Sequence, residues 1–176
     1  NSLFDANILS GSNWCFLINA GNSVGNIFLN NNLTCPNMIV DVSGGSNTLI
    51  YNNSFGKVIW ANRADVSITE NDAGAGSIAL GKNLYLGSNT FAFNTSAAIL
   101  AASVPNITLN GLSFGTISAI KKLNSYETSA ATIQSTGTNC LGSGCDQISY
   151  TGGILEFNTT SLGSFAAQEA SNVKCV

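Results

Sequence analysis

The chain has 176 residues, enough for about one domain with a core of its own. Only 9 % of the residues are charged, against about 25 % in an average soluble domain, and the net charge is −3. Six Lys+Arg cannot form the cationic surface that nucleic acid requires, and the absence of His excludes imidazole-dependent catalysis and His-ligated zinc.

The uncharged residues predict a folded protein rich in strands and turns. Apolar residues make up 44 % of the chain, which argues against disorder, and 24 Asn, 36 Ser+Thr and 18 Gly supply turn formers. The longest apolar run, from Ala97 to Val104, is too short to cross a bilayer. The chain begins at Asn1 without a signal sequence, as a processed secreted protein or a fragment does.

The first segment, residues 1–12, shows no strand series. Its apolar side chains are candidates for assembly, because an apolar N-terminal stretch can complete the sheet of a neighbouring subunit. The assembly candidates are Leu3, Phe4, Ile8 and Leu9.

Residues 13–124 carry two series of short alternating segments with a mean spacing near 20. The first series is marked by Leu29, Tyr51, Ile68, Leu86 and Leu109, with spacings of 22, 17, 18 and 23. The second is marked by Ile39, Ile59, Ile78, Ile99 and Ile117, with spacings of 20, 19, 21 and 18. Two series in phase predict a right-handed parallel β-solenoid of five to six coils, each of about 20 residues.

This repeat resembles that of the pectate-lyase-like parallel β-helix superfamily, which includes lyases, tailspikes and surface adhesins. The segments that carry the resemblance are Thr48–Phe55 and Asn106–Phe114. The resemblance implies a rod of stacked coils and leaves the function open. A β-sandwich or a jelly-roll, pilin-like subunit has a similar sequence pattern of short strands and turns, and it is the alternative fold.

Residues 125–176 lack the 20-residue repeat. We expect them to cap the solenoid, since an open end exposes unpaired backbone. Within them, Gln147–Tyr150 and Ile154–Phe157 predict a strand pair around Thr151–Gly153. The segment 163–170 predicts a short helix.

Five cysteines favour disulfides in an oxidising compartment. Cys140 and Cys145 enclose a flexible Leu-Gly-Ser-Gly loop, and Cys15 and Cys35 are about one repeat apart, which leaves Cys175 unpaired. A metal site is disfavoured, because the chain has no CxxC pair and no His.

Candidate catalytic groups are few. The only acidic concentration is Asp65, Glu70 and Asp72, with Arg63 nearby, and solvated corners explain it best. Trp14, Tyr51 and Trp60 are candidate carbohydrate-stacking platforms, although core positions suit them better. We therefore expect no enzyme activity, no metal and no cofactor.

Five sequons mark candidate glycosylation sites, namely Asn32, Asn52, Asn94, Asn106 and Asn158. Chance alone predicts about five from 24 Asn and 36 Ser+Thr in 176 residues, so only their corner positions add weight.

Together these features predict an extracellular or surface-exposed structural or adhesive protein, a subunit of a fibre, filament, tailspike or surface layer. Its expected partners are further copies of itself and surface glycans, without nucleic acid or membrane insertion. The alternative is a carbohydrate-active β-helix enzyme or a glycan-binding module.

Stability should be insensitive to pH between about 6 and 7, because no His titrates there. Thermal unfolding followed by circular dichroism at both pH values checks this. A midpoint shift of several degrees would contradict it.

Overall fold

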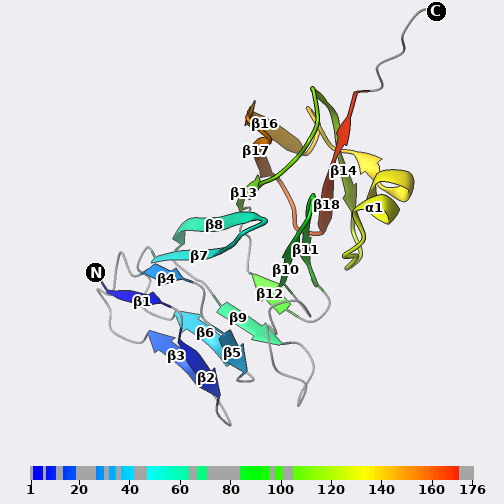
Figure 1. Cartoon of the computed structure of the whole chain (residues 1–176). Helices are drawn as coiled ribbons and strands as arrows, with labels where there is room; N and C mark the ends of the chain where they lie inside the picture. The colour runs from blue at the N-terminus through cyan, green and yellow to red at the C-terminus, as the bar shows by residue number, and fades with distance from the viewer. Residues whose placement is uncertain are drawn as a thin grey trace, which may run out of the picture.

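The computed structural model describes residues 2–5, 7–10, 14–18, 27–29, 32–34, 37–41, 47–63, 67–70, 84–95, 98–100 and 105–170. Strands dominate the described part of the chain (Figure 1). The first nine are β1 Leu3–Asp5, β2 Ile8–Ser10, β3 Trp14–Ile18, β4 Ile27–Leu29, β5 Asn32–Thr34, β6 Asn37–Asp41, β7 Asn47–Asn53, β8 Gly56–Arg63 and β9 Ser67–Glu70. The rest are β10 Leu84–Gly87, β11 Thr90–Phe93, β12 Ala98–Leu100, β13 Asn106–Leu109, β14 Ile117–Leu123, α1 Ala130–Thr136, β15 Thr138–Asn139, β16 Cys145–Thr151, β17 Ile154–Thr159 and β18 Ser164–Glu169.

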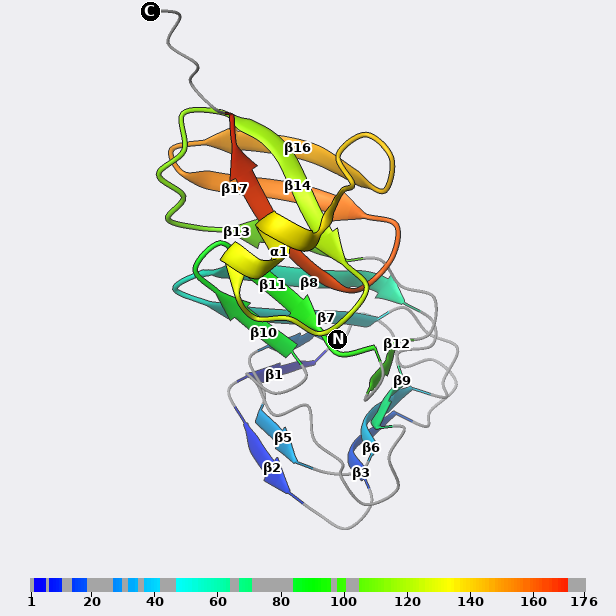
Figure 2. The same ribbon diagram turned by 90° about the vertical axis from the view of Figure 1, so that its right-hand side faces the viewer.

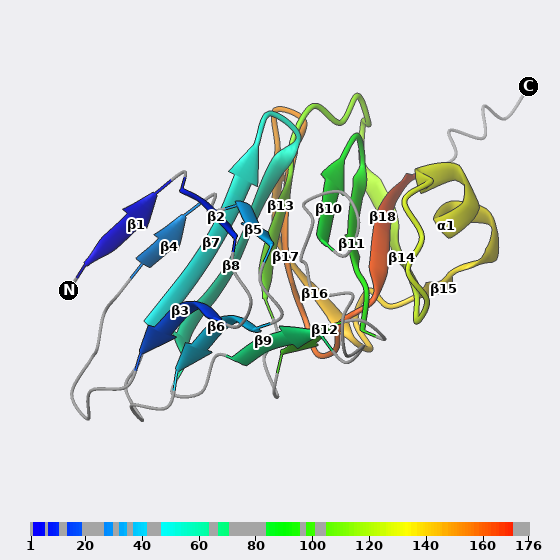
Figure 3. The same cartoon turned by 90° about the horizontal axis from the view of Figure 1, so that it is seen from below.

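Two antiparallel sheets form a β-sandwich. One contains four antiparallel strands in the order β8-β13-β17-β16, and the other contains five in the order β10-β11-β18-β14-β15. The two layers lie side by side in Figure 3. Helix α1 packs on the outer side of the five-stranded sheet, against β14 and β18 (Figure 2).

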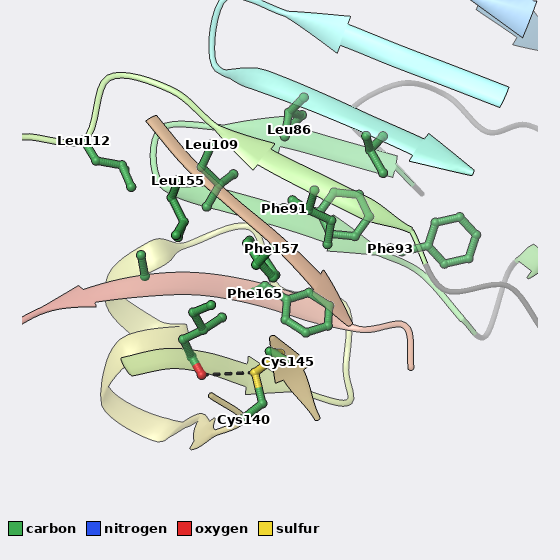
Figure 4. Packing of buried hydrophobic residues seen from close by; sticks show 14 residues of the cluster. Leu86, Phe91, Phe93, Leu109, Leu112, Cys140, Cys145, Leu155, Phe157 and Phe165 are labelled. Carbon is green, nitrogen blue, oxygen red and sulfur yellow. Dashed lines mark hydrogen bonds between the residues drawn. A yellow bond between two sulfur atoms is a disulfide. The ribbon is translucent and has the colours of Figure 1, made fainter. Parts of the chain in front are cut away.

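Alternation along the strands places the core between the layers. In β17, Leu155, Phe157 and Thr159 are buried while the residues between them are half-buried or exposed. The same period of two holds in β13, where Ile107 and Leu109 are fully buried. The inward side chains of both sheets form one cluster (Figure 4).

Parallel pairing occurs among the first seven strands. Strands β1, β4 and β7 pair in parallel and extend the four-stranded sheet to seven, and β2–β5 and β3–β6 are further parallel pairs. Strand β6 then pairs with β9 in the antiparallel sense, and β9 with β12 likewise. In Figures 1 and 3 these N-terminal strands lie on the side away from α1.

The predicted parallel solenoid over residues 13–124 is wrong, and so is the resemblance to the pectate-lyase-like superfamily. Each described pairing between two of the strands β7 to β18 is antiparallel. Ile59, expected to stack above Ile39, lies opposite Ile50 and Asn106 instead. The sandwich that stood as the alternative describes the fold.

Two-residue hairpin turns explain the error. Asn53 pairs with Gly56, Gly87 with Thr90 and Thr151 with Ile154, so each chain reversal uses only two residues. Short alternating strands at regular spacings occur in an antiparallel sandwich as well as in a solenoid. The 20-residue spacing therefore indicates where strands lie but not whether neighbouring strands pair in parallel or antiparallel.

The C-terminal segment belongs to the sandwich. The strand pair around Thr151–Gly153 is confirmed as the hairpin β16–β17. The expected helix over 163–170 is wrong, because this segment is β18, an interior strand between β11 and β14. Its residues Ser164 to Ala167 are all buried. In the described residues no helix is long and apolar enough to span a membrane.

The side chain of Asn89 extends the ladder between β11 and β18. Phe91 pairs with Phe165 and Ala92 with Ser164, so continuing this register places Asn89 opposite Ala167. The chain turns at this position, so the side-chain amide of Asn89 takes the place of a backbone amide in the ladder. Its Oδ1 accepts from the Ala167 N–H at 2.9 Å, and its Nδ2 donates to the Ala167 carbonyl at 2.9 Å.

Asn also suits the backbone at this turn. Asn89 has φ 53°, in the left-handed region that Asn and Gly tolerate best. Asn89 is buried, so the two hydrogen bonds satisfy groups that solvent cannot reach.

Replacing Asn89 by Gly should lower the free energy of unfolding by about 2–4 kcal/mol, because Gly keeps the positive φ while the Ala167 groups lose their partners. Urea denaturation measures the change. The matched control is Ser88→Gly at the exposed neighbouring turn position. Equal losses in both variants would show that the amide pairing contributes nothing.

Candidate functional site

Three segments meet around an open cavity of about 360 Å³ at one end of the sandwich. The β10–β11 turn contributes Ser88 and Asn89, the β13–β14 connection contributes Gly111–Phe114, and α1 contributes Ala130 and Gln134. These segments are distant in sequence, so the cavity exists only in the folded chain.

Helix α1 is fixed by its cap and by one buried side chain. Ser129 is the N-cap, and its hydroxyl accepts from the Thr132 N–H at 3.3 Å. Glu127 accepts from the Ser129 N–H at 2.7 Å, and Ile133 is fully buried. Residues four apart share a helix face, which explains why Ala130 and Gln134 both line the cavity.

Two primary amides converge on one backbone carbonyl beside the cavity. Gln134 Nε2 donates to the Ala167 carbonyl at 2.7 Å, and Asn89 Nδ2 donates to the same oxygen at 2.9 Å. A primary amide carries two N–H groups and an acceptor oxygen. Each amide thus keeps a second N–H beyond the one that Ala167 uses.

The 110–114 loop is held from both sides. Asn110 donates its N–H to the Phe55 carbonyl at 2.7 Å, and Leu112 donates to Gly153 at 2.9 Å. The Tyr150 hydroxyl donates to the Phe114 carbonyl at 2.6 Å. A Cβ on Gly153 would lie 2.6 Å from the Leu112 oxygen, so glycine permits this close approach. The loop is therefore set before any ligand arrives.

The cavity is electrically neutral. None of its lining residues carries a charge. Among the described residues with a shifted pKa, burial lowers the pKa of Lys122, and burial together with Tyr85 raises the pKa of Tyr126. Lys122 is occupied elsewhere, with its ammonium 5.9 Å from the Phe165 ring centroid and donating to the Ser161 hydroxyl.

The Cys140–Cys145 disulfide is confirmed, with an S–S distance of 2.11 Å. Both cysteines are buried, and Cys140 Sγ lies 3.1 Å from the Ile120 carbonyl (Figure 4). Such a bond is sustained in an oxidising compartment. Cys15 lies in β3 with an undescribed side chain, and Cys35 and Cys175 lie outside the described residues, so their pairing stays a prediction.

Two of the five sequons lie side by side on the outer face of the sandwich. Asn106 of β13 pairs in register with Asn158 of β17 and donates to its Oδ1 at 3.3 Å. Asn106 also donates to Glu156 at 3.0 Å. Asn94 is half-buried just after β11, while Asn32 in β5 and Asn52 in β7 have side chains outside the described residues. Glycosylation stays a prediction at all five.

The assembly candidates are divided between the surface and the core. Leu3 is 62 % exposed, whereas Phe4 and Leu9 are half-buried and pack against the core cluster. Ile8 lies in β2 with an undescribed side chain. Strand β1 pairs with β4 of its own chain and ends the seven-stranded sheet, so its second edge has no strand partner among the described residues.

The acidic concentration falls largely outside the described residues. Asp65 and Asp72 are not described, and the side chains of Glu70 in β9 and Arg63 in β8 are not described either. The described part of the chain holds no group of three metal-ligating side chains. Trp14, Tyr51 and Trp60 lie in β3, β7 and β8, also without described side chains.

The residues that line the cavity were not singled out from the sequence. One signal was available, since Leu84–Gly87 and Thr90–Phe93 flank two turn residues and so predict a hairpin with Ser88 and Asn89 at its tip. Comparison of the chain with models of known families, curated proteins and solved structures finds no match.

Replacing Cys140 and Cys145 together by Ala should lower the free energy of unfolding by about 2 kcal/mol, because the bond closes a loop of about six residues in the unfolded chain. Chemical denaturation without reductant measures this. Ser143→Ala, in the same exposed loop, serves as the control. An unchanged midpoint in the double variant would contradict a stabilising role for the disulfide.

Proposed function

We propose that this chain is a structural or adhesive module of an extracellular protein and that it acts without catalysis. The observation that carries the proposal is the buried Cys140–Cys145 disulfide, which suits an oxidising environment. The composition supports it too, because a chain with 9 % charged residues and no His changes its charge little between about pH 6 and 7.

Self-association is part of this proposal, and β16 is the edge on which we place it. Strand β16 ends the four-stranded sheet and pairs only with β17 among the described strands. Asp146 to Ser149 are exposed, and Asp146 is the only charged residue of the strand. An edge without Lys or Pro offers its backbone to another strand, and a second copy of this chain presents the same edge.

Ile148 provides an apolar contact on that edge. It is 51 % exposed and lies at the register shift between Gln147 and Ser149. Ile154 is 47 % exposed on the same hairpin but belongs to the interior strand β17. The two isoleucines thus differ in their place on the sheet far more than in exposure.

Sedimentation velocity over about a hundredfold range of concentration tests the proposal. We expect the wild type to associate, Ile148→Lys to weaken association about tenfold by placing charge on the edge, and Ile154→Lys to change it little.

A wild type that stays monomeric throughout this range would contradict self-association through β16. Equal weakening by both substitutions would contradict the edge as the site. Turnover of a uronic-acid polysaccharide by the purified chain would contradict the absence of catalysis.

A further inference from the structure

We propose that the cavity between the β10–β11 turn, the 110–114 loop and α1 binds a neutral oligosaccharide. The inference rests on the proposed adhesive function and gives it a ligand class. It is carried by the coincidence in one preformed cavity of uncharged hydrogen-bonding groups, an apolar surface with an aromatic ring, and a volume that suits a small molecule.

The polar groups match sugar hydroxyls. A hydroxyl both donates and accepts, and the lining offers both functions through the amides of Asn89 and Gln134 and the hydroxyls of Ser88 and Ser113. Asn89 and Gln134 are oriented by the Ala167 carbonyl, which each reaches through one N–H. Among the described residues the second N–H of each amide has no hydrogen-bond partner, and the bond to Ala167 holds each amide group in place.

The apolar part of the lining suits the carbon face of a sugar ring. Leu112, which is 6 % exposed, and the half-buried Phe114 line the cavity and also pack in or against the core cluster. An aromatic ring carries partial negative charge on its face, which attracts the weakly positive C–H groups of a pyranose. The Phe114 carbonyl is tied to Tyr150, so the backbone that carries this ring is held in place.

The absence of charge in the lining selects neutral sugars. A phosphate, sulfate or uronate loses its hydration on entering a site and needs a cation or several N–H donors in return. No Lys or Arg lines this cavity. A neutral hydroxyl needs only ordinary hydrogen bonds, which the four polar side chains provide.

The cavity also has suitable size and order. Its volume of about 360 Å³ lies in the usual range of about 300–1,000 Å³ for small-molecule sites. Gly111, at φ +73°, has no heavy atom within 4 Å of the position a Cβ would take. A loop already fixed by backbone hydrogen bonds loses little entropy on binding.

The test uses a printed panel of neutral disaccharides and trisaccharides of glucose, galactose and mannose, followed by calorimetric titration of the strongest binder. We expect at least one neutral sugar to bind and digalacturonate not to bind, because no cation lines the cavity. Ala130→Trp should raise the dissociation constant at least about tenfold by filling the cavity.

Ala131→Trp is the matched control, since Ala131 is exposed on the same helix and does not line the cavity. Ser113→Trp fills the cavity from a different segment, so a folding defect in one variant leaves the other informative. Circular dichroism verifies the fold of each variant.

Failure of every neutral sugar to bind would overturn the proposal, as would binding that both tryptophan variants leave unchanged. Sedimentation of the same sample separates this outcome from failure of the proposed function. If the chain self-associates but binds no sugar, the proposed structural function stands and only the sugar-binding proposal fails.

Discussion

Packing of Phe165 against Phe91 and Phe157 joins the two sheets, and the rest of the sandwich depends on it. Phe157 belongs to one sheet and Phe165 to the other, with ring centroids 5.9 Å apart, and Phe91 stacks on Phe165 within its own sheet at 6.1 Å. All three rings are almost fully buried. Buried rings in such contacts contribute beyond the area they remove from water, so this cluster fixes the distance and register of the layers.

The candidate site depends on the same strand. Phe165 lies in β18, and two residues further on Ala167 receives the amides of Asn89 and Gln134. The cavity wall is thus attached to the strand that the core holds most firmly. A shift of β18 would separate the turn of β10–β11 from α1 and would open the site.

The sequence located strands well and paired them poorly. Segments marked by Leu29, Leu86 and Leu109 lie in β4, β10 and β13, because alternation of apolar and polar residues reports a half-buried strand directly. Alternation carries no information on the neighbour's direction. The direction is decided by turns such as Ser88-Asn89, whose two-residue length makes the strands on either side antiparallel.

Two features lay beyond local pattern. Residues 164–167 are Ser-Phe-Ala-Ala, whose alanines favour a helix, yet burial between β11 and β14 makes them a strand. The cavity joins residues from positions 88 to 134, and Asn89 is paired with a residue 78 positions away. The Cys140–Cys145 bond and the β16–β17 hairpin were local enough to be predicted, because each closes a short glycine-containing segment.

The antiparallel sandwich is the central claim, and nuclear Overhauser spectroscopy across β13 and β17 tests it most directly. The account predicts Hα–Hα cross-peaks between facing residues at the non-hydrogen-bonded positions of these strands, with Asn106 opposite Asn158 and Thr108 opposite Glu156. Antiparallel strands bring such protons close together, whereas parallel strands do not. Cross-peaks that instead connect equivalent residues of parallel strands would contradict the sandwich.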